Sequence, residues 1–134
     1  MRRHIFMTLA ASAAFAEALR LVHALQHRRG IIEVLEGCAL LSVLEDDPVR
    51  AVTMAGATAA MRRASNLPSV KTRIGKLRDD AVSRAWTQID ERAARCAWDA
   101  GALLSLEALV ALALDGHRVP GPPPTENSSD RAGV

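Results

Sequence analysis

Two histidines in this chain have a spacing that could do chemistry. His23 and His27 stand four residues apart, so on one helix they would share a face and could bind one metal ion. No third ligand stands at a diagnostic spacing, and His4 and His117 fall in predicted loose ends. We therefore interpret the pair as surface histidines near a helix C-terminus, which the helix dipole favours, and we predict no metal and no cofactor.

A run of cations could contact phosphate groups. Residues 62 to 84 hold seven Lys or Arg and two Asp, whereas residues 31 to 61 hold five acids and one Arg. The candidate phosphate contacts are Lys71, Arg73, Lys76, Arg78 and Arg84. They flank an apolar stripe on both sides, and Lys76 can pair with Asp80 one helical turn later. We therefore favour solvated helix flanks, with buried methylene stems, over nucleic-acid binding.

The sequence contains none of the common catalytic motifs. There is no G-x-x-x-x-G-K-[ST] phosphate loop, no G-x-S-x-G elbow and no H-E-x-x-H pair. The adjacent acids Asp46 and Asp47 precede Pro48, where helix capping explains them. Cys38 and Cys96 lie on different predicted helices without C-x-x-C spacing, which indicates buried free thiols. We predict no catalytic residues and no enzyme.

The elements that position these residues are expected to be helices. Apolar residues make up 49% of the chain and aromatic residues only 3%, and alanine and leucine dominate, which favours close-packed helices over a sheet. We predict one all-α domain over residues 7–116. Residues 1–6 are expected to be a flexible N-terminus. Residues 117–134, rich in proline, glycine and polar side chains, are expected to be a disordered tail.

Capping and turn signals divide the domain into about six helices. Asp47 before Pro48, then Asp90 and Ser105, are the predicted N-caps. The expected helices cover about residues 7–27, 30–44, 48–64, 69–88, 91–103 and 106–116. In the second helix the predicted packing positions are Ile31, Leu35, Cys38, Ala39 and Ser42. In the fourth helix the predicted apolar stripe is Val70, Ile74, Leu77, Ala81 and Ala85.

The first segment is open to more than one interpretation. Residues 5–25 carry only two charges, Glu17 and Arg20. Arg2, Arg3 and the small-x-small triplet at 14–16 are typical of a cleaved signal, so an exported protein that loses residues 1–16 is one alternative. The apolar pattern continues past residue 16, however, and two charges inside a bilayer are costly, which favours a cytoplasmic core helix over a membrane span.

The order of helices resembles a known regulator family. The quoted segments are AFAEALRLVHALQHRRGIIEVLEGCALLSVLEDDPVRAVTMAGATAAMRR, then LP, then AWDAGALLSLEALVALAL. They resemble the C-terminal tetratricopeptide-like region of actinobacterial LuxR-type regulators and cyclase-linked signalling ATPases, over about residues 13–115. Ala39 and Ala51 match the small residues of such a helical hairpin. The chain departs from the family at Asp46, usually glycine, and at Ala108, where a Glu would complete a capping box with Ser105.

The resemblance implies a fold and a role. It implies antiparallel hairpins stacked as a short tetratricopeptide-like α-solenoid, without the ATPase and helix-turn-helix domains of the relatives. Residues 7–27 then correspond to the second helix of a preceding repeat, and its uncovered side is expected to recruit a second copy, another protein or a loosely folded N-terminal segment. The predicted interaction residues are Phe6, Leu9, Phe15, Leu19 and Val22.

These expectations define the predicted function and its alternatives. We predict a non-catalytic protein–protein interaction module of a transcriptional regulator, with no membrane contact and no nucleic-acid binding on its own. The alternatives are a small DNA-binding accessory protein that uses the basic helix over residues 69–88, and the exported protein described above.

Overall fold

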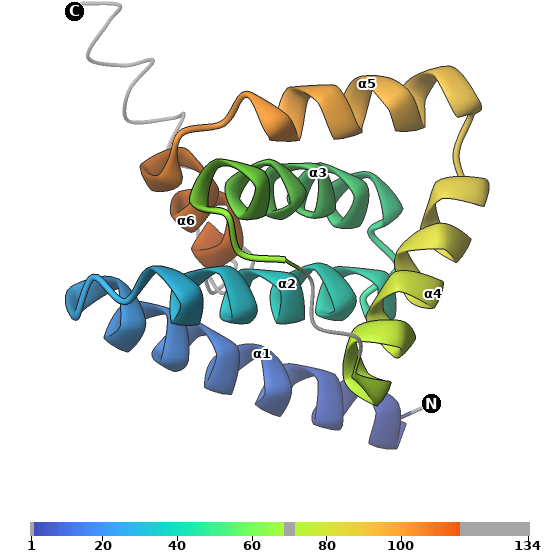
Figure 1. The fold of residues 1–134 in the computed structure, drawn as a ribbon. Helices are drawn as coiled ribbons and strands as arrows, with labels where there is room; N and C mark the ends of the chain where they lie inside the picture. Colours follow the sequence, from blue (N-terminus) through green and yellow to red (C-terminus); the bar gives the residue numbers. More distant parts are fainter. Residues whose placement is uncertain (1, 69–71, 116–134) are drawn as a thin grey trace, which may run out of the picture.

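The chain is all-α, as its composition predicted. A computed structural model describes residues 2–68 and 72–115, with the side chains of residues 2–10 left aside, and the predicted tail over 117–134 lies outside this part. Over the described residues there are six helices, again as predicted (Figure 1). They are α1 Arg2–Ala24, α2 Arg28–Leu44, α3 Pro48–Ser65, α4 Arg73–Thr87, α5 Glu91–Ala102 and α6 Leu106–Asp115. Helix α1 thus begins inside the segment predicted to be flexible.

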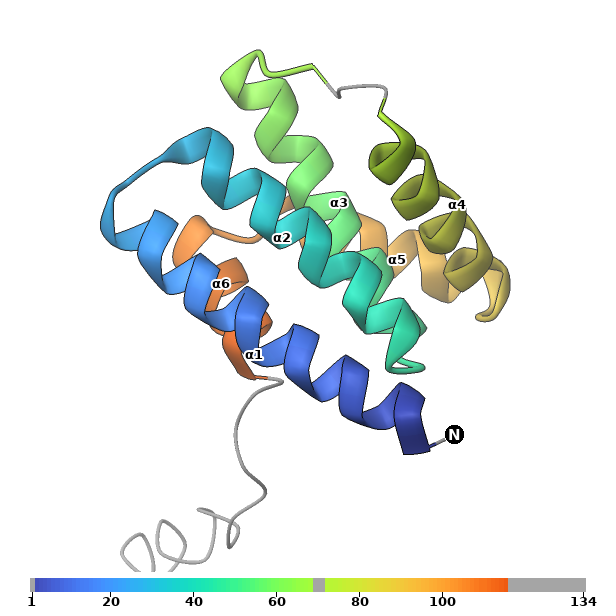
Figure 2. The same cartoon turned by 90° about the horizontal axis from the view of Figure 1, so that it is seen from below.

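Four helices form one layer. α1, α2, α3 and α5 lie side by side in that order, and α4 and α6 pack on opposite sides of the layer (Figures 1 and 2). α2 and α3 form the antiparallel hairpin that the sequence predicted. α5 runs in the same direction as α3 and packs along it, whereas it meets α4 mainly at a corner. The stacking of hairpins into a solenoid therefore stays a prediction.

The three predicted caps are confirmed. Asp47 accepts a hydrogen bond from the backbone N–H of Arg50 at 3.2 Å, and Pro48 occupies the first turn of α3. Asp90 accepts from the N–H of Ala93 at 3.3 Å, and Ser105 accepts from that of Ala108 at 3.1 Å. Each side chain satisfies one of the N–H groups that a helix start leaves without an intrahelical partner.

Two further caps were not predicted. The Nδ1 atom of His27 accepts from the N–H of Gly30 at 2.8 Å, and the hydroxyl of Thr72 accepts from that of Gly75 at 2.9 Å. α2 therefore begins at Arg28, before the predicted start at residue 30, and α4 begins at Arg73, after the predicted start near residue 69.

The core is centred on α2. Its five predicted packing positions are all buried, which confirms the helical period read from the sequence. They pack with Leu19 of α1, Met54 of α3 and Leu109 of α6, so the hydrophobic core joins the layer to one of its flanking helices. A second, smaller cluster joins Val52 of α3 to Ala85 of α4 and to α5.

Helices α3 and α5 approach each other closely because two glycines lie at their contact. A Cβ atom at Gly56 would overlap the carbonyl oxygen of Trp98, and one at Gly101 would overlap that of Thr53. Only residues without a side chain fit at these two positions. Burial of Ala94 and Ala97 on α5 completes this small-residue contact.

The predicted stripe of α4 is only partly buried. Ala81 and Ala85 face the layer, but Ile74 and Leu77 are 72% and 55% exposed, and Val70 lies outside the described residues. The physical reason is Arg78, whose side chain turns inward to a buried carboxylate and sets which face of α4 meets the layer. The spacing of apolar residues along α4 does not predict this ion pair.

Candidate functional site

The exposed side of α1 carries an apolar strip. Leu21 and Leu25 are 61% and 68% exposed, Ala14 is exposed and Ala18 is half-buried. These four residues follow one another at spacings of four, three and four, so the first three share one face of α1. Leu25 lies in the turn directly after α1 and continues this face, because its backbone N–H still donates to the carbonyl of Leu21 at 3.0 Å. We call this set the outer face of α1. It lies at the edge of the layer, where α1 has a neighbour on one side only (Figure 1).

The predicted interaction residues lie elsewhere. Leu19 is fully buried in the core, and Phe15 and Val22 pack against the same core cluster. The ring of Phe15 lies where a Cβ of Gly37 would otherwise stand, so it fills a gap on α2. The expectation of an exposed strip at these three residues was therefore wrong, because they form the inward face of α1. The side chains of Phe6 and Leu9 lie outside the described part.

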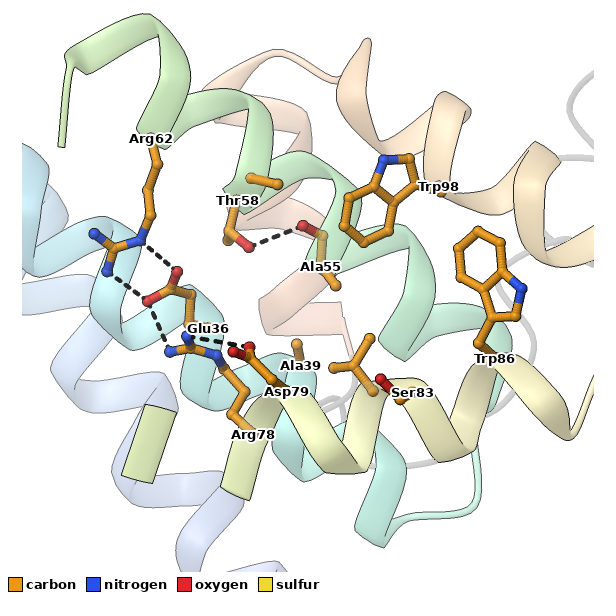
Figure 3. A pocket seen from close by; sticks show the side chains of 12 residues that line it. Glu36, Ala39, Ala55, Thr58, Arg62, Arg78, Asp79, Ser83, Trp86 and Trp98 are labelled. Atoms are coloured by element: carbon orange, nitrogen blue, oxygen red, sulfur yellow. Dashed lines mark hydrogen bonds and ion pairs between the residues drawn. The ribbon is translucent and has the colours of Figure 1, made fainter. Parts of the chain in front are cut away.

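A buried charge cluster joins α2, α3 and α4. The carboxylate of Glu36 accepts hydrogen bonds from Nε and Nη2 of Arg62 at 2.6 and 2.7 Å, and from Nη1 of Arg78 at 3.0 Å (Figure 3). Nη1 of Arg62 also donates to the backbone carbonyl of Pro68 at 3.0 Å. The hydrogen bonds to Glu36 raise the pKa of Arg62 further above its already high value. Arg62 therefore stays charged beside this buried carboxylate.

A groove of about 510 Å³ runs from this cluster to two tryptophans. The indole rings of Trp86 and Trp98 stand edge to face with centroids 6.0 Å apart. Between the charged end and the aromatic end lie small side chains, among them Ala39, Ala55 and Ser83 (Figure 3). The sequence patterns did not predict this groove. The signal was an acid, Glu36, between the packing positions Leu35 and Ala39 of an otherwise apolar helix face.

The predicted phosphate contacts do not act as one group. Arg73, Lys76 and Arg84 are exposed on α4, whereas Arg78 is engaged in the charge cluster and Lys71 lies outside the described residues. Within the described chain, no ion pair joins Lys76 to Asp80. The structure thus divides the predicted set into three solvated cations and one structural arginine.

The two histidines do not share a helix face. His23 lies in the last turn of α1, whereas His27 caps α2 after a turn in which Gln26 adopts a left-handed backbone conformation, with φ of 55°. Because the chain reverses between them, the predicted four-residue relation along one helix was wrong. Among the described residues, no group of three or more His, Cys, Asp or Glu side chains is placed to hold a metal ion.

The two cysteines differ in environment. Cys38 is a buried free thiol, as predicted, and burial raises its pKa to about 11 despite the nearby charge of Arg50. Cys96 is exposed on α5, so the prediction that it is buried was wrong. The inward positions of this helix are occupied by Ala94 and Ala97 instead.

Within the described part of the chain, no helix combines the length and the apolar character needed to cross a bilayer. Comparison of the chain with family models, with curated proteins and with solved structures found no match.

Proposed function

We propose that this chain is a non-catalytic helical interaction module that binds a second copy of itself through the outer face of α1. The observation that supports this proposal is the exposure of Leu21 near the end of α1 and of Leu25 in the turn directly after it. Leaving two leucines in water forgoes the roughly 1.5–3 kcal/mol that burial of each side chain can contribute. Docking of another helix against this face would recover part of that free energy.

The size pattern of the outer face favours a second copy as the partner. If two α1 helices pair in opposite directions with Ala18 opposite Leu21 of the other copy, Ala14 falls opposite the other Leu25. A small side chain then faces a large one at each level, which is how well-packed helix pairs interdigitate. Such an interface is isologous, as in most homodimers.

The proposed interface is small. One helix pair buries less than the ~800 Å² per partner of a standard interface, so we expect a reversible dimer that dissociates on dilution. The same role agrees with the resemblance to the tetratricopeptide-like arrays of LuxR-type regulators, in which a neighbouring repeat would cover this helix. We propose that resemblance as the family relation of the chain.

Analytical ultracentrifugation over a concentration series tests the proposal. We expect the wild-type weight-average mass to rise with concentration, and the double variant Leu21→Glu/Leu25→Glu to remain monomeric. The matched control is Ile74→Glu/Leu77→Glu, which makes the same change at two equally exposed positions on α4. A wild-type protein that stays monomeric throughout, or loss of association in the α4 control alone, overturns the proposal. Circular dichroism verifies that each variant keeps its helices.

A further inference from the structure

We propose that the groove between α2, α3, α4 and α5 binds a small amphipathic carboxylate, with its apolar or aromatic body against the tryptophans and its anionic group at Arg78. This inference is independent of self-association through α1. The volume of about 510 Å³ falls within the range of small-molecule sites, which is roughly 300–1,000 Å³.

The aromatic end is suited to a flat apolar group. Trp86 and Trp98 line the groove together with Val82, and the small side chains of Ala55 and Ala59 leave room above the α3 backbone. The indole N–H of Trp86 donates to Glu91 at 2.6 Å, which fixes the orientation of its ring. A fixed pair of aromatic rings offers contact area at little cost in side-chain entropy.

The charged end carries more buried positive than negative charge. Glu36 is the buried carboxylate, and it faces the two guanidinium groups of Arg62 and Arg78. The ion-pair partner of Arg78 besides Glu36 is Asp79, which is exposed and lies 3.4 Å from Nη2 of Arg78, a geometry in which a surface ion pair contributes little. An incoming carboxylate can therefore take the place of Asp79 without uncovering a buried charge.

Arg78 is the cation that a ligand can reach. Its side chain is 17% exposed, compared with 8% for Arg62, and both line the groove. The contacts of Arg78 with Glu36 and Asp79 use two of the five N–H donors of a guanidinium group. The others can form charge-assisted hydrogen bonds to a carboxylate, so we infer preference for an anion over a neutral or cationic analogue.

Intrinsic fluorescence tests the proposal directly, because both tryptophans of the chain line the groove and the chain contains no tyrosine. The probes are 4-phenylbutyrate, its neutral analogue 4-phenylbutanol and its cationic analogue 4-phenylbutylamine. We expect a saturable fluorescence change with the carboxylate. We also expect at least about tenfold weaker binding of the alcohol and the amine, since neither offers a carboxylate to accept charge-assisted hydrogen bonds from Arg78.

Two variants assign the binding to the groove. Arg78→Gln should reduce the affinity for 4-phenylbutyrate about tenfold and leave that for 4-phenylbutanol unchanged, whereas Arg78→Lys should retain most of the preference for the anion. Arg84→Gln is the matched control on the same helix, outside the groove, and should change neither affinity. Ala55→Leu, which adds volume to the groove wall, should weaken both probes.

Any of three outcomes would overturn the proposal. They are the absence of a saturable fluorescence change with 4-phenylbutyrate, equal affinities for the three probes, and an Arg78→Gln variant that binds the carboxylate as the wild type does. Chemical-shift changes of the two indole N–H groups in a ¹H–¹⁵N spectrum provide a second measurement. Should Arg78→Gln fail to fold, comparison of the three probes on the wild-type protein still decides the question.

Discussion

At the scale of single residues, Glu36 organises the interior. It is an acid on the packing face of α2, and three short hydrogen bonds from Arg62 and Arg78 satisfy both of its oxygens. A buried carboxylate without such partners would cost several kcal/mol, so the three side chains must be considered as one unit. Arg78 is the member of this unit on α4, and its hydrogen bond to Glu36 on α2 therefore holds α4 against the layer.

We predict that Glu36→Gln lowers the free energy of unfolding by about 3 kcal/mol. The amide keeps the size of the side chain but removes the buried carboxylate that faces Arg62 and Arg78, and Arg78 then keeps only the exposed Asp79 as an ion-pair partner. Urea unfolding followed by tryptophan fluorescence measures the loss. The control is Glu17→Gln, at an exposed position of α1 outside the charge cluster, where we expect a change below about 0.5 kcal/mol. Equal effects of the two variants would contradict the role given to Glu36.

At the scale of elements, the sequence predicted the helix ends well where a capping residue marks them. Asp47 with Pro48, Asp90 and Ser105 are such signals, and each caps the helix that it was predicted to cap. The start of α2 was misplaced because no Gly, Pro or Asn marks the turn after α1, which depends on Gln26 in a left-handed conformation. A left-handed conformation at glutamine has no sequence signature, whereas Asp46 and Asn66, which also have positive φ, are of the residue types that favour it.

In the turn between α2 and α3, we predict that substitutions at two adjacent aspartates change the stability in opposite directions. Asp46 has φ of 58°, a conformation that glycine adopts without steric cost, so we predict that Asp46→Gly stabilises the protein by about 0.5–1 kcal/mol. Asp47→Ala removes the N-cap of α3 and should destabilise it by about 1 kcal/mol. Thermal unfolding measures both changes. Shifts of the midpoint in the same direction would show that the conformation of the turn does not decide its stability.

At the scale of the whole molecule, what the sequence could not predict is how the helices meet. The spacing of apolar residues predicted which face of α2 points inward. It did not predict which helices contact α1, and the residues predicted as an interaction strip, Phe15, Leu19 and Val22, pack in the core instead. The groove has the same origin, since it requires α4 to lie across the layer with Arg78 pointing inward. Long-range contacts between polar and small residues decide both features, and a periodicity along one helix does not report them.

Helix α6 closes the core over Cys38. Nη2 of Arg50 on α3 donates to the carbonyl oxygens of Leu112 and Ala113 at 2.7 and 2.9 Å, which anchors the last turn of α6. The favourable interaction of a cation with a helix C-terminus adds to these hydrogen bonds. Ala113 and Leu109 then pack in the cluster that contains the Cys38 thiol. Cys38 is 5% exposed, so this packing shields its thiol from solvent.

The stability of the whole molecule should therefore fall in alkali. Burial raises the pKa of Cys38 from 9.0 to about 11, so between these two pH values the folded state retains a proton that the unfolded state has lost. The free energy of unfolding then decreases with rising pH across this window and levels off above it, by roughly 2–3 kcal/mol in total. Urea unfolding at a series of pH values from 8 to 11.5 measures the slope, in a Cys96→Ser background that prevents cross-linking of the exposed thiol.

Cys38→Ala should unfold at lower urea at pH 8, because the core loses volume, yet show a flatter pH dependence. An unchanged slope in this variant would contradict the assignment of the alkaline loss to Cys38.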